Sequence, residues 1–227
     1  MATNRVFLIG ICGGSGSGKT TFAQKILKDV GAGRISMLHM DAYYLDTLPK
    51  NIYTTSNKPN FDHPGAFDWE LLRTHLQELR NGRAVQTPVY DFSTSSRTER
   101  SDLVHPTKVV IVEGIFTLFD QDIRDLLDIK CFLHVDSDIR FTRRLHRDVK
   151  ERGRSLESVI AQYYDTVRPM YQKYLDPQRQ YADFVVGEET DVASSILSAR
   201  LRELLTPAGH ASIEQGNPWK LYSRLCQ

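Results

Sequence analysis

Eight residues close to the N-terminus carry the strongest chemical signal in the sequence. Residues 13–20 read Gly-Gly-Ser-Gly-Ser-Gly-Lys-Thr, the pattern of a loop that binds the phosphates of a nucleotide. The glycines allow a tight turn whose backbone N–H groups surround phosphate oxygens at the start of a helix. We expect Lys19, read as a solvated charge, to reach the terminal phosphates and Thr20 to bind Mg²⁺.

The surroundings of this loop agree with that interpretation. An apolar run at residues 6–11 precedes it and a helical pattern at residues 20–30 follows it, as a phosphate-binding loop requires. A flexible glycine-rich turn is the weaker alternative. The residues expected to bind the triphosphate are Gly13, Gly14, Ser15, Gly16, Ser17, Gly18, Lys19, Thr20 and Thr21.

Two carboxylates follow apolar runs that read as buried strands. Asp41 comes directly after residues 35–40, and Glu113 comes directly after residues 109–112. In an open α/β sheet the carboxyl ends of the strands face the ligand crevice, so both acids should point towards the triphosphate. A capping or solvated carboxylate is the alternative for either residue taken alone.

Basic residues gather in the segment 138–154, which carries a net charge of +4 in a chain whose formal net charge is only +1. Arg147, Arg152 and Arg154 flank a helix end and a glycine, an arrangement that resembles a lid closing on phosphates. For Arg140 and Lys150 we favour a solvated helix face. A nucleic-acid surface is a third interpretation, but the patch is short and the chain nearly neutral.

The elements that must position these residues alternate between apolar runs and helical patterns, which is typical of a parallel sheet covered by helices. The predicted strands are residues 6–11, 35–40, 109–112, 131–135 and 184–186. The predicted helices are residues 20–30, 69–79, 138–150, 156–174 and 192–205. Asp68 should cap the second of these helices, and Gly82 follows its end.

Two polar and aromatic insertions interrupt the alternation. Residues 42–67 are too aromatic for an idle linker, and residues 84–106 read as a strand, a loop and a return strand. We expect a single domain over residues 1–205, with a lid at about residues 147–156 and a weakly patterned tail at residues 206–227.

Composition narrows the class of protein. The chain has 227 residues, of which 41% are hydrophobic and 25% charged, as in ordinary globular proteins. The apolar run at residues 6–11 lacks the flanks of a signal peptide, and we see no run of the roughly 20 apolar residues that span a bilayer. Three scattered cysteines favour a reducing compartment over a disulfide framework. We therefore expect a cytoplasmic protein with no membrane and no nucleic-acid partner.

Several short motifs, taken together and in order from about residue 7 to residue 183, resemble the uridine/cytidine kinase family. Besides the glycine-rich loop they are Asp41-Ala-Tyr-Tyr, Asn60-Phe-Asp-His-Pro, Pro88-Val-Tyr-Asp-Phe, Glu113-Gly-Ile, Arg143-Arg, Arg147-Asp, Glu151-Arg-Gly-Arg and Tyr181-Ala-Asp. The resemblance implies an α/β phosphate-loop fold: a five-stranded, mainly parallel sheet flanked by helices, with an acceptor-binding β-hairpin and an arginine lid. It also implies ATP or GTP as donor, Mg²⁺, small-molecule nucleosides as acceptors and a homotetramer.

The resemblance further implies roles at the matching positions. Asp41 corresponds to the acid that directs the nucleoside 5′-hydroxyl, and Glu113 to an acid associated with Mg²⁺, while Lys19, Arg147 and Arg152 neutralise charge on the transferring phosphoryl group. Asp62, Arg144 and Gln162 correspond to residues that hold the ribose hydroxyls. The residues implied to enclose the nucleoside are Tyr44, Phe61, Tyr90, Phe92 and Arg154.

Two departures from the family pattern leave the substrates open. Ser95 stands where the family commonly has a histidine that contacts the pyrimidine base, so a bridging water is the expected substitute. Residues 184–189, near the donor base in the family, also depart from its pattern, which leaves ATP and GTP both open. A kinase of another ribosyl or small hydroxylated acceptor, or a nucleotide-binding module without turnover, are the remaining alternatives.

Overall fold

Five parallel strands form the centre of the molecule in this computed structural model, which describes residues 5–31, 33–54, 56–92 and 94–206. The strand order is β2-β5-β1-β6-β7. Their bounds are β1 Phe7–Gly13, β2 Ile35–His39, β5 Val109–Gly114, β6 Ile129–Leu133 and β7 Phe184–Val186. Each pairing between neighbours is parallel, which confirms the predicted sheet.

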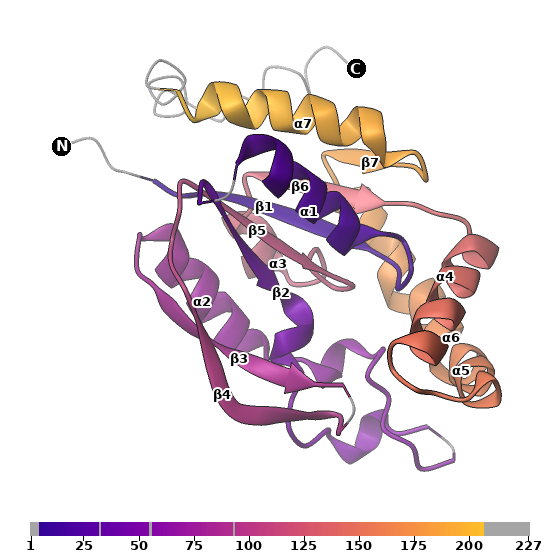
Figure 1. The fold of residues 1–227 in the computed structure, drawn as a ribbon. Coiled ribbons are helices and arrows are strands. Elements are labelled where there is room, and N and C mark those ends of the chain that lie inside the picture. The colour runs from indigo at the N-terminus through magenta and orange to yellow at the C-terminus, as the bar shows by residue number, and fades with distance from the viewer. Residues whose placement is uncertain (1–4, 32, 55, 93, 207–227) are drawn as a thin grey trace.

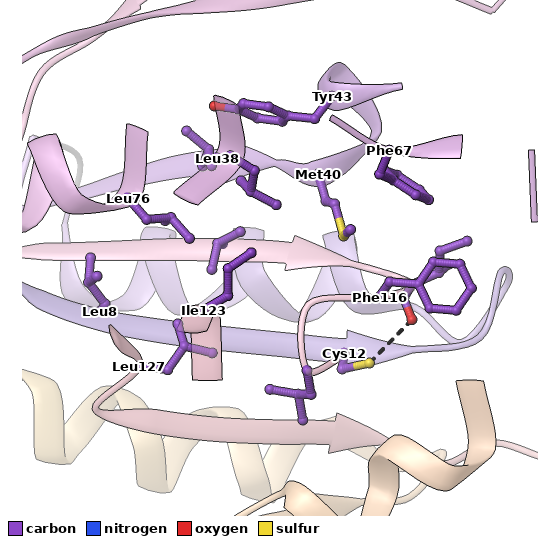
Figure 2. Close-up of a cluster of buried hydrophobic side chains, with 14 of the residues drawn as sticks. Leu8, Cys12, Leu38, Met40, Tyr43, Phe67, Leu76, Phe116, Ile123 and Leu127 are labelled. Atoms are coloured by element: carbon purple, nitrogen blue, oxygen red, sulfur yellow. Dashed lines mark hydrogen bonds between the residues drawn. The ribbon is translucent and has the colours of Figure 1, made fainter. Parts of the chain in front are cut away.

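Helices cover both faces of this sheet (Figure 1). On one face α1 (Lys19–Val30) and α7 (Thr190–Leu204) pack together, and their apolar residues join one buried cluster with β1, β5 and β6. On the other face α2 (Trp69–Arg80) and α3 (Gln121–Leu126) contribute to a second cluster. Figure 2 shows part of that cluster, in which Met40, Phe67 and Phe116 lie near the carboxyl ends of the strands. The sheet is thus buried from both sides, so its strands are apolar almost throughout.

The helix boundaries follow local signals in the sequence. The carboxylate of Asp68 accepts a hydrogen bond from the backbone of Leu71 and caps α2, as predicted. After α2 the chain turns through Gly82, whose φ is +76°. Sequence reasoning overlooked α3, a six-residue helix that Asp120 caps through Ile123.

The predicted hairpin is present beside the sheet. Strands β3 (Val85–Asp91) and β4 (Ser96–Val104) pair antiparallel, with a register irregularity between Pro88 and Tyr90. In Figure 1 the hairpin projects away from the five-stranded sheet. Residues 40–67 contain short 3₁₀ turns, Met40–Tyr43, Lys50–Ile52 and Pro64–Ala66.

The lid region departs in detail from its prediction. Helix α4 (Ser137–Lys150) is followed by a turn and by α5 (Leu156–Gln162). Residues 156–174 are helical, as predicted, but they do not form one regular α-helix. π-Helical turns at Tyr163–Val167 and Tyr171–Leu175 lie on either side of α6 (Arg168–Met170), and a 3₁₀ helix follows at Asp176–Tyr181. Pro169 lies in this stretch and cannot donate a helical hydrogen bond. Most of the predicted tail, residues 207–227, lies outside the described residues.

Candidate active site

The glycine-rich loop joins the end of β1 to the start of α1. Gly18 precedes the helix with a φ of +90°, and no acidic residue lies in the first helical turn, so the helix N-terminus is free to attract an anion. Gly16, with a φ of +80°, runs so close to α4 that an added Cβ would lie 2.3 Å from the carbonyl oxygen of Arg140. A Cβ at Gly14 would lie 2.6 Å from the guanidinium of the same arginine. Position 16 therefore requires glycine, whereas a side chain at position 14 would displace Arg140.

Arg140 supports the loop from behind, and its predicted place on a solvated helix face is wrong. Its residue surface is only 4% exposed. The guanidinium donates from Nε to the carbonyl of Val135 at 2.8 Å and stacks over the ring of Tyr171 at 3.8 Å. Burial is tolerated because the charge has both a hydrogen-bond acceptor and an aromatic face. Lys150 is exposed, as predicted.

Lys19 also differs from its prediction, because it is 9% exposed and not a solvated charge. Its ammonium donates to the carbonyl of Gly14 at 3.2 Å, which folds the side chain back over the loop. Next to it the hydroxyl of Thr20 donates to Oε1 of Glu113 at 2.9 Å. The loop and the end of β5 are thus joined through the two residues predicted to hold a metal ion.

Glu113 is held by a second strand as well. His39, its register partner at the end of β2, approaches the same Oε1 with Nδ1 at 2.8 Å. Burial alone would raise the pKa of Glu113, but the His39 hydrogen bond, the Lys19 charge and the Thr20 hydroxyl outweigh burial and lower it. The same hydrogen bond raises the pKa of His39. Glu113 is therefore held as a carboxylate at the edge where a triphosphate would end.

Asp41 lies directly after β2, in the 3₁₀ turn Met40–Tyr43, and lines the same cleft as Lys19 and Glu113. Burial raises the pKa of its carboxyl, and the nearby charge of Glu113 raises it further. Lys19, Arg152 and Arg147 act in the opposite direction but do not cancel the rise. A carboxylate with a raised pKa is a better proton acceptor, which suits a group that faces an attacking hydroxyl.

Four arginines surround one buried carboxylate beside the loop. Asp148, on α4, has a side chain with 0% exposure and accepts from Nε of Arg147 at 3.0 Å. Arg147 also reaches the hydroxyl of Ser15 in the loop at 3.4 Å. Arg144, Arg152 and Arg154 lie within 3.6 Å of the Asp148 carboxylate. Three arginines of the predicted lid, together with Arg144 from outside it, thus surround one carboxylate.

The side of the cleft that is predicted to bind the acceptor is polar at one end. Thr166 donates to Oδ2 of Asp62 at 2.8 Å, and Arg144 lies 4.0 Å from Oδ1 of the same carboxylate. Gln162 accepts hydrogen bonds from Arg144, at 3.0 Å, and from Arg154. A carboxylate beside an arginine and an amide provides both acceptors and donors for vicinal hydroxyls.

The rest of the acceptor side is aromatic. The Tyr44 ring lies 5.4 Å from Phe61 and 5.2 Å from Tyr90, and Phe92 lies 5.3 Å from Tyr90, all in edge or tilted geometry. Phe92 is 44% exposed, and the guanidinium of Arg152 lies 4.2 Å above its ring. Ser95 follows in the hairpin turn with a left-handed φ of +54°. The wall can cover a flat ring system such as a nucleobase.

One cleft of about 660 Å³ gathers most of the predicted site. All the residues predicted to bind the acceptor, all the predicted catalytic residues and both predicted metal ligands line it, together with Ser15 of the loop. A neighbouring cleft of about 650 Å³ is lined by Gly16, Gly18 and Thr21 and shares Lys19 and Asp41 with the first. Gly13, Gly14 and Ser17 are buried and line neither cleft.

Sequence reasoning missed several residues of this site. Asp148 had a signal, since Arg144 and Arg152 both stand four residues from it on a helical pattern. His39 could have been found from its place at a strand end two residues before Asp41. Thr166 had no local signal, because its partner Asp62 lies 104 residues away. Thr54 and Lys58 line the cleft from the first insertion and were likewise not predicted.

The oxygen atoms at the loop suit Mg²⁺. This ion binds hard oxygen ligands and usually takes only one or two from the protein, the remainder coming from phosphates and water. The hydroxyl of Thr20 and the carboxylate of Glu113 meet at 2.9 Å beside the loop. Among the described residues, none of the helices has the length and apolar character needed to span a membrane.

Comparison with known proteins places this geometry in a family. Residues 8–195 match the model of the phosphoribulokinase/uridine kinase family. A uridine kinase of Limosilactobacillus reuteri is 43% identical over 92% of this chain and 96% of its own. A uridine kinase of Lactobacillus helveticus is 46% identical over 87% of this chain and 95% of its own.

Solved structures share the fold at lower identity. A putative fructose transport system kinase from Silicibacter aligns with a TM-score of 0.65 and 22% identity over 80% of this chain and 90% of its own. A possible uridine kinase from Bacillus stearothermophilus gives a TM-score of 0.57 and 21% identity over 80% of this chain and 88% of its own. The match of the family model over most of the sequence, and relatives that align along nearly their whole length, show that this chain belongs to the phosphoribulokinase/uridine kinase family.

Proposed function

We propose that the protein transfers the γ-phosphoryl group of ATP or GTP to the 5′-hydroxyl of uridine or cytidine, giving UMP or CMP in pyrimidine salvage. The observation that carries this proposal is the single cleft in which Asp41 lies between a phosphate-binding loop and a pocket of aromatic and hydroxyl-binding side chains. The uridine kinases that align with nearly the whole chain support the choice of acceptor.

The donor end of the cleft positions the triphosphate. Backbone N–H groups of the loop and the N-terminus of α1 hold phosphate oxygens, and Lys19 moves from the Gly14 carbonyl to the terminal phosphates. Thr20 and Glu113 would hold Mg²⁺, which would balance negative charge on the triphosphate. Arg147 and Arg152 neutralise charge that develops on the transferring group.

The acceptor end positions the hydroxyl. Asp62, Arg144 and Gln162 hydrogen-bond the ribose hydroxyls, and the aromatic wall with Arg154 encloses the base. The carboxylate of Asp41 accepts the proton of the 5′-hydroxyl as that oxygen attacks the γ-phosphorus, and the bond from this phosphorus to the β-phosphate oxygen breaks to release the nucleoside diphosphate. Most of the rate would then come from positioning and from electrostatic stabilisation.

The test is release of ADP in a coupled assay with a panel of acceptors. We expect turnover with uridine and cytidine, and poor turnover with their 2′-deoxy forms, because sites built to bond a hydroxyl reject analogues without it by up to about 10⁴-fold. Adenosine, nicotinamide riboside and a reaction without acceptor are the controls. Turnover with another acceptor but with no pyrimidine ribonucleoside would overturn the nucleoside assignment and leave only the kinase.

Ser95 favours a second candidate, a kinase of another ribosyl or small hydroxylated acceptor. Its short side chain in the hairpin turn leaves the base edge without the histidine that the family commonly places there. The same panel separates the two candidates.

We extend the proposal to a cytoplasmic homotetramer. Light scattering of the purified protein checks the oligomeric state, and cell fractionation checks the location.

A further inference from the structure

The contacts of Asp148 do not resemble those of an ordinary buried ion pair. Its carboxylate is fully buried, yet among the described residues only Arg147 hydrogen-bonds it, from Nε to Oδ1 at 3.0 Å, with Nη2 forming an ion pair to the same oxygen at 2.8 Å. Oδ2 has no hydrogen-bond partner in the described part of the chain, although Nε of Arg144 lies 3.4 Å and Nη1 of Arg154 3.6 Å away. A buried carboxylate kept only for stability would have both oxygens satisfied.

The four arginines around Asp148 have other partners that all line the cleft. Arg147 reaches Ser15 of the phosphate loop, and Arg152 lies over Phe92 of the acceptor hairpin. Arg144 reaches Asp62, and both Arg144 and Arg154 bond Gln162. Asp148 itself does not line the cleft. It therefore stands behind a ring of guanidiniums that connects the donor end of the site to its acceptor end.

The charges explain why such a group is needed. Four guanidiniums within 3.6 Å of one point repel one another, and without a counter-charge they would separate towards solvent. Asp148 neutralises a single charge and Asp62 lies 4.0 Å from Arg144, so the four guanidiniums keep an excess of two positive charges over these two carboxylates. Since three of the four arginines are near Asp148 without hydrogen-bonding it, they can turn to phosphate oxygens without breaking a hydrogen bond to that residue.

We propose that Asp148 is a positioning residue that holds the lid arginines in the arrangement required for phosphoryl transfer. It acts through the arginines and touches neither donor nor acceptor. The proposal rests on the proposed phosphoryl transfer for its reaction, but it makes a separate statement about how the cleft binds a triphosphate.

The main test is Asp148→Asn, which keeps the shape and removes the charge. Positioning predicts a fall in kcat of at least about tenfold, because misplaced guanidiniums lose contacts made in the transition state. It also predicts that affinity for a slowly hydrolysed ATP analogue, measured by calorimetry, is no more than about threefold weaker, since removal of a negative charge favours the anion. Asp128→Asn, which removes another buried arginine-paired carboxylate far from the cleft, is the matched control and should keep kcat.

Other roles of Asp148 give other results. A role in stability alone predicts that kcat stays at the wild-type value at temperatures where the variant is folded. If Asp148 acts only as a negative charge that weakens the attraction for the triphosphate, Asp148→Asn should raise both kcat and the affinity for the ATP analogue. Either result overturns the proposal, as does a fall in kcat accompanied by an equal loss of affinity.

A double-mutant cycle tests whether Asp148 acts through its hydrogen-bonded arginine. We compare kcat for Arg147→Ala, Asp148→Asn and the double variant. The fold-loss of kcat in the double variant should be at least about threefold smaller than the product of the two single-variant losses. Losses that multiply would show that the two residues act independently and would overturn the proposal.

Two further measurements cover the remaining cases. If Asp148→Asn does not fold, Asp148→Glu keeps the charge and displaces the carboxylate by one methylene; we expect a fall in kcat, and a wild-type kcat would contradict positioning. If the wild type phosphorylates no ribonucleoside, the proposed function fails. The slow hydrolysis of ATP and calorimetry with the ATP analogue then still report on the arginines. For Asp148→Asn we again expect a slower rate of hydrolysis with little change in affinity.

Discussion

Two buried aspartates, each paired with arginines, lie at opposite edges of the sheet and differ in how completely they are satisfied. Asp128, just before β6, accepts from the backbone of Leu8 at 2.9 Å, from Arg5 at 2.6 Å and from both terminal nitrogens of Arg80. Asp148, beside the phosphate loop, accepts a hydrogen bond from the described residues on one carboxylate oxygen only and has an excess of cations around it. The first cluster is closed, whereas the second has unused hydrogen-bonding capacity.

The difference teaches how to separate structure from function among buried charges. A charge taken out of water is costly unless its partners replace the lost hydration, so a closed cluster is what stability alone requires. An unfinished cluster of like charges costs stability unless a ligand completes it. Variants at the carboxyl-terminal edge should therefore change turnover, and variants at the opposite edge should change the free energy of unfolding.

The largest effect on turnover is expected for Lys19→Ala. The variant should abolish phosphoryl transfer, because the ammonium is the loop's own cation for the terminal phosphates. Thermal unfolding should show the fold intact, since the one hydrogen bond that the Lys19 ammonium donates to a described residue is that to the Gly14 carbonyl. Turnover within tenfold of the wild type, about 1.4 kcal/mol of barrier, would contradict the role.

Asp41→Asn should have the next largest effect. It keeps the shape and removes the proton acceptor, so kcat should fall by about 10²- to 10⁴-fold while the KM for the donor changes little. Steady-state kinetics with each substrate varied in turn measures both quantities. An unchanged kcat, or a loss confined to donor binding, would move the base to another residue.

Asp128→Asn tests the opposite edge. Loss of one partner from a buried ion pair leaves Arg80 uncompensated and should lower the free energy of unfolding by about 3–5 kcal/mol. At a temperature where the variant is folded, kcat should stay within about twofold of the wild type. Chemical denaturation and the ADP-release assay measure the two quantities, and a large loss of kcat in the folded variant would break the comparison.

The pH dependence of kcat and of stability gives a further test of the comparison, through the carboxyl of Asp41. Burial raises the pKa of this carboxyl, so kcat should fall about tenfold per pH unit below that raised value, where the base is protonated. Stability runs the other way: a raised folded-state pKa favours the protonated form, and that contribution is lost as pH rises through the pKa. Unfolding of wild type and Asp41→Asn across pH should show the variant gaining relative stability towards neutral pH. If the fall of kcat at low pH persists in Asp41→Asn, it belongs to another titrating residue.

The smallest effect is expected for Ser95→His at the hairpin turn. An imidazole should restore a direct contact to the base. The KM for at least one pyrimidine ribonucleoside should then fall by the factor that corresponds to the roughly 0.5–1.5 kcal/mol of a net hydrogen bond. The left-handed backbone at this position is one that histidine tolerates. Kinetics with uridine and cytidine decide the matter, and a raised KM for both would argue against a base contact here.

Sequence patterns predicted the sheet and the edge at which the site lies. The glycine-rich loop and the acids after β2 and β5 are local in sequence, and parallel strands bring their carboxyl ends together without further information. The family resemblance supplied the acceptor residues, and the structure gathers them on one cleft. Their individual roles stay predictions.

The errors concern side chains whose partners come from distant parts of the chain. The burial of Arg140 depends on Tyr171, which packs onto α4 only in the folded protein, so helical periodicity alone assigned it to solvent. The hydrogen bond from Thr166 to Asp62 spans 104 residues. The π-helical turns between α5 and the 3₁₀ helix at Asp176–Tyr181 likewise have no periodic signature in the sequence.

The contact between Arg152 and Phe92 joins a lid and a hairpin that both lie outside the central sheet. The walls of the acceptor pocket are thus built from segments separate from the strands that carry the phosphate loop. A designer who wishes to change the proposed acceptor can therefore vary Phe92 on the hairpin and keep Arg152, to which the phosphoryl-transfer proposal also assigns a role. The buried framework, and with it the phosphate-binding half, would need no redesign.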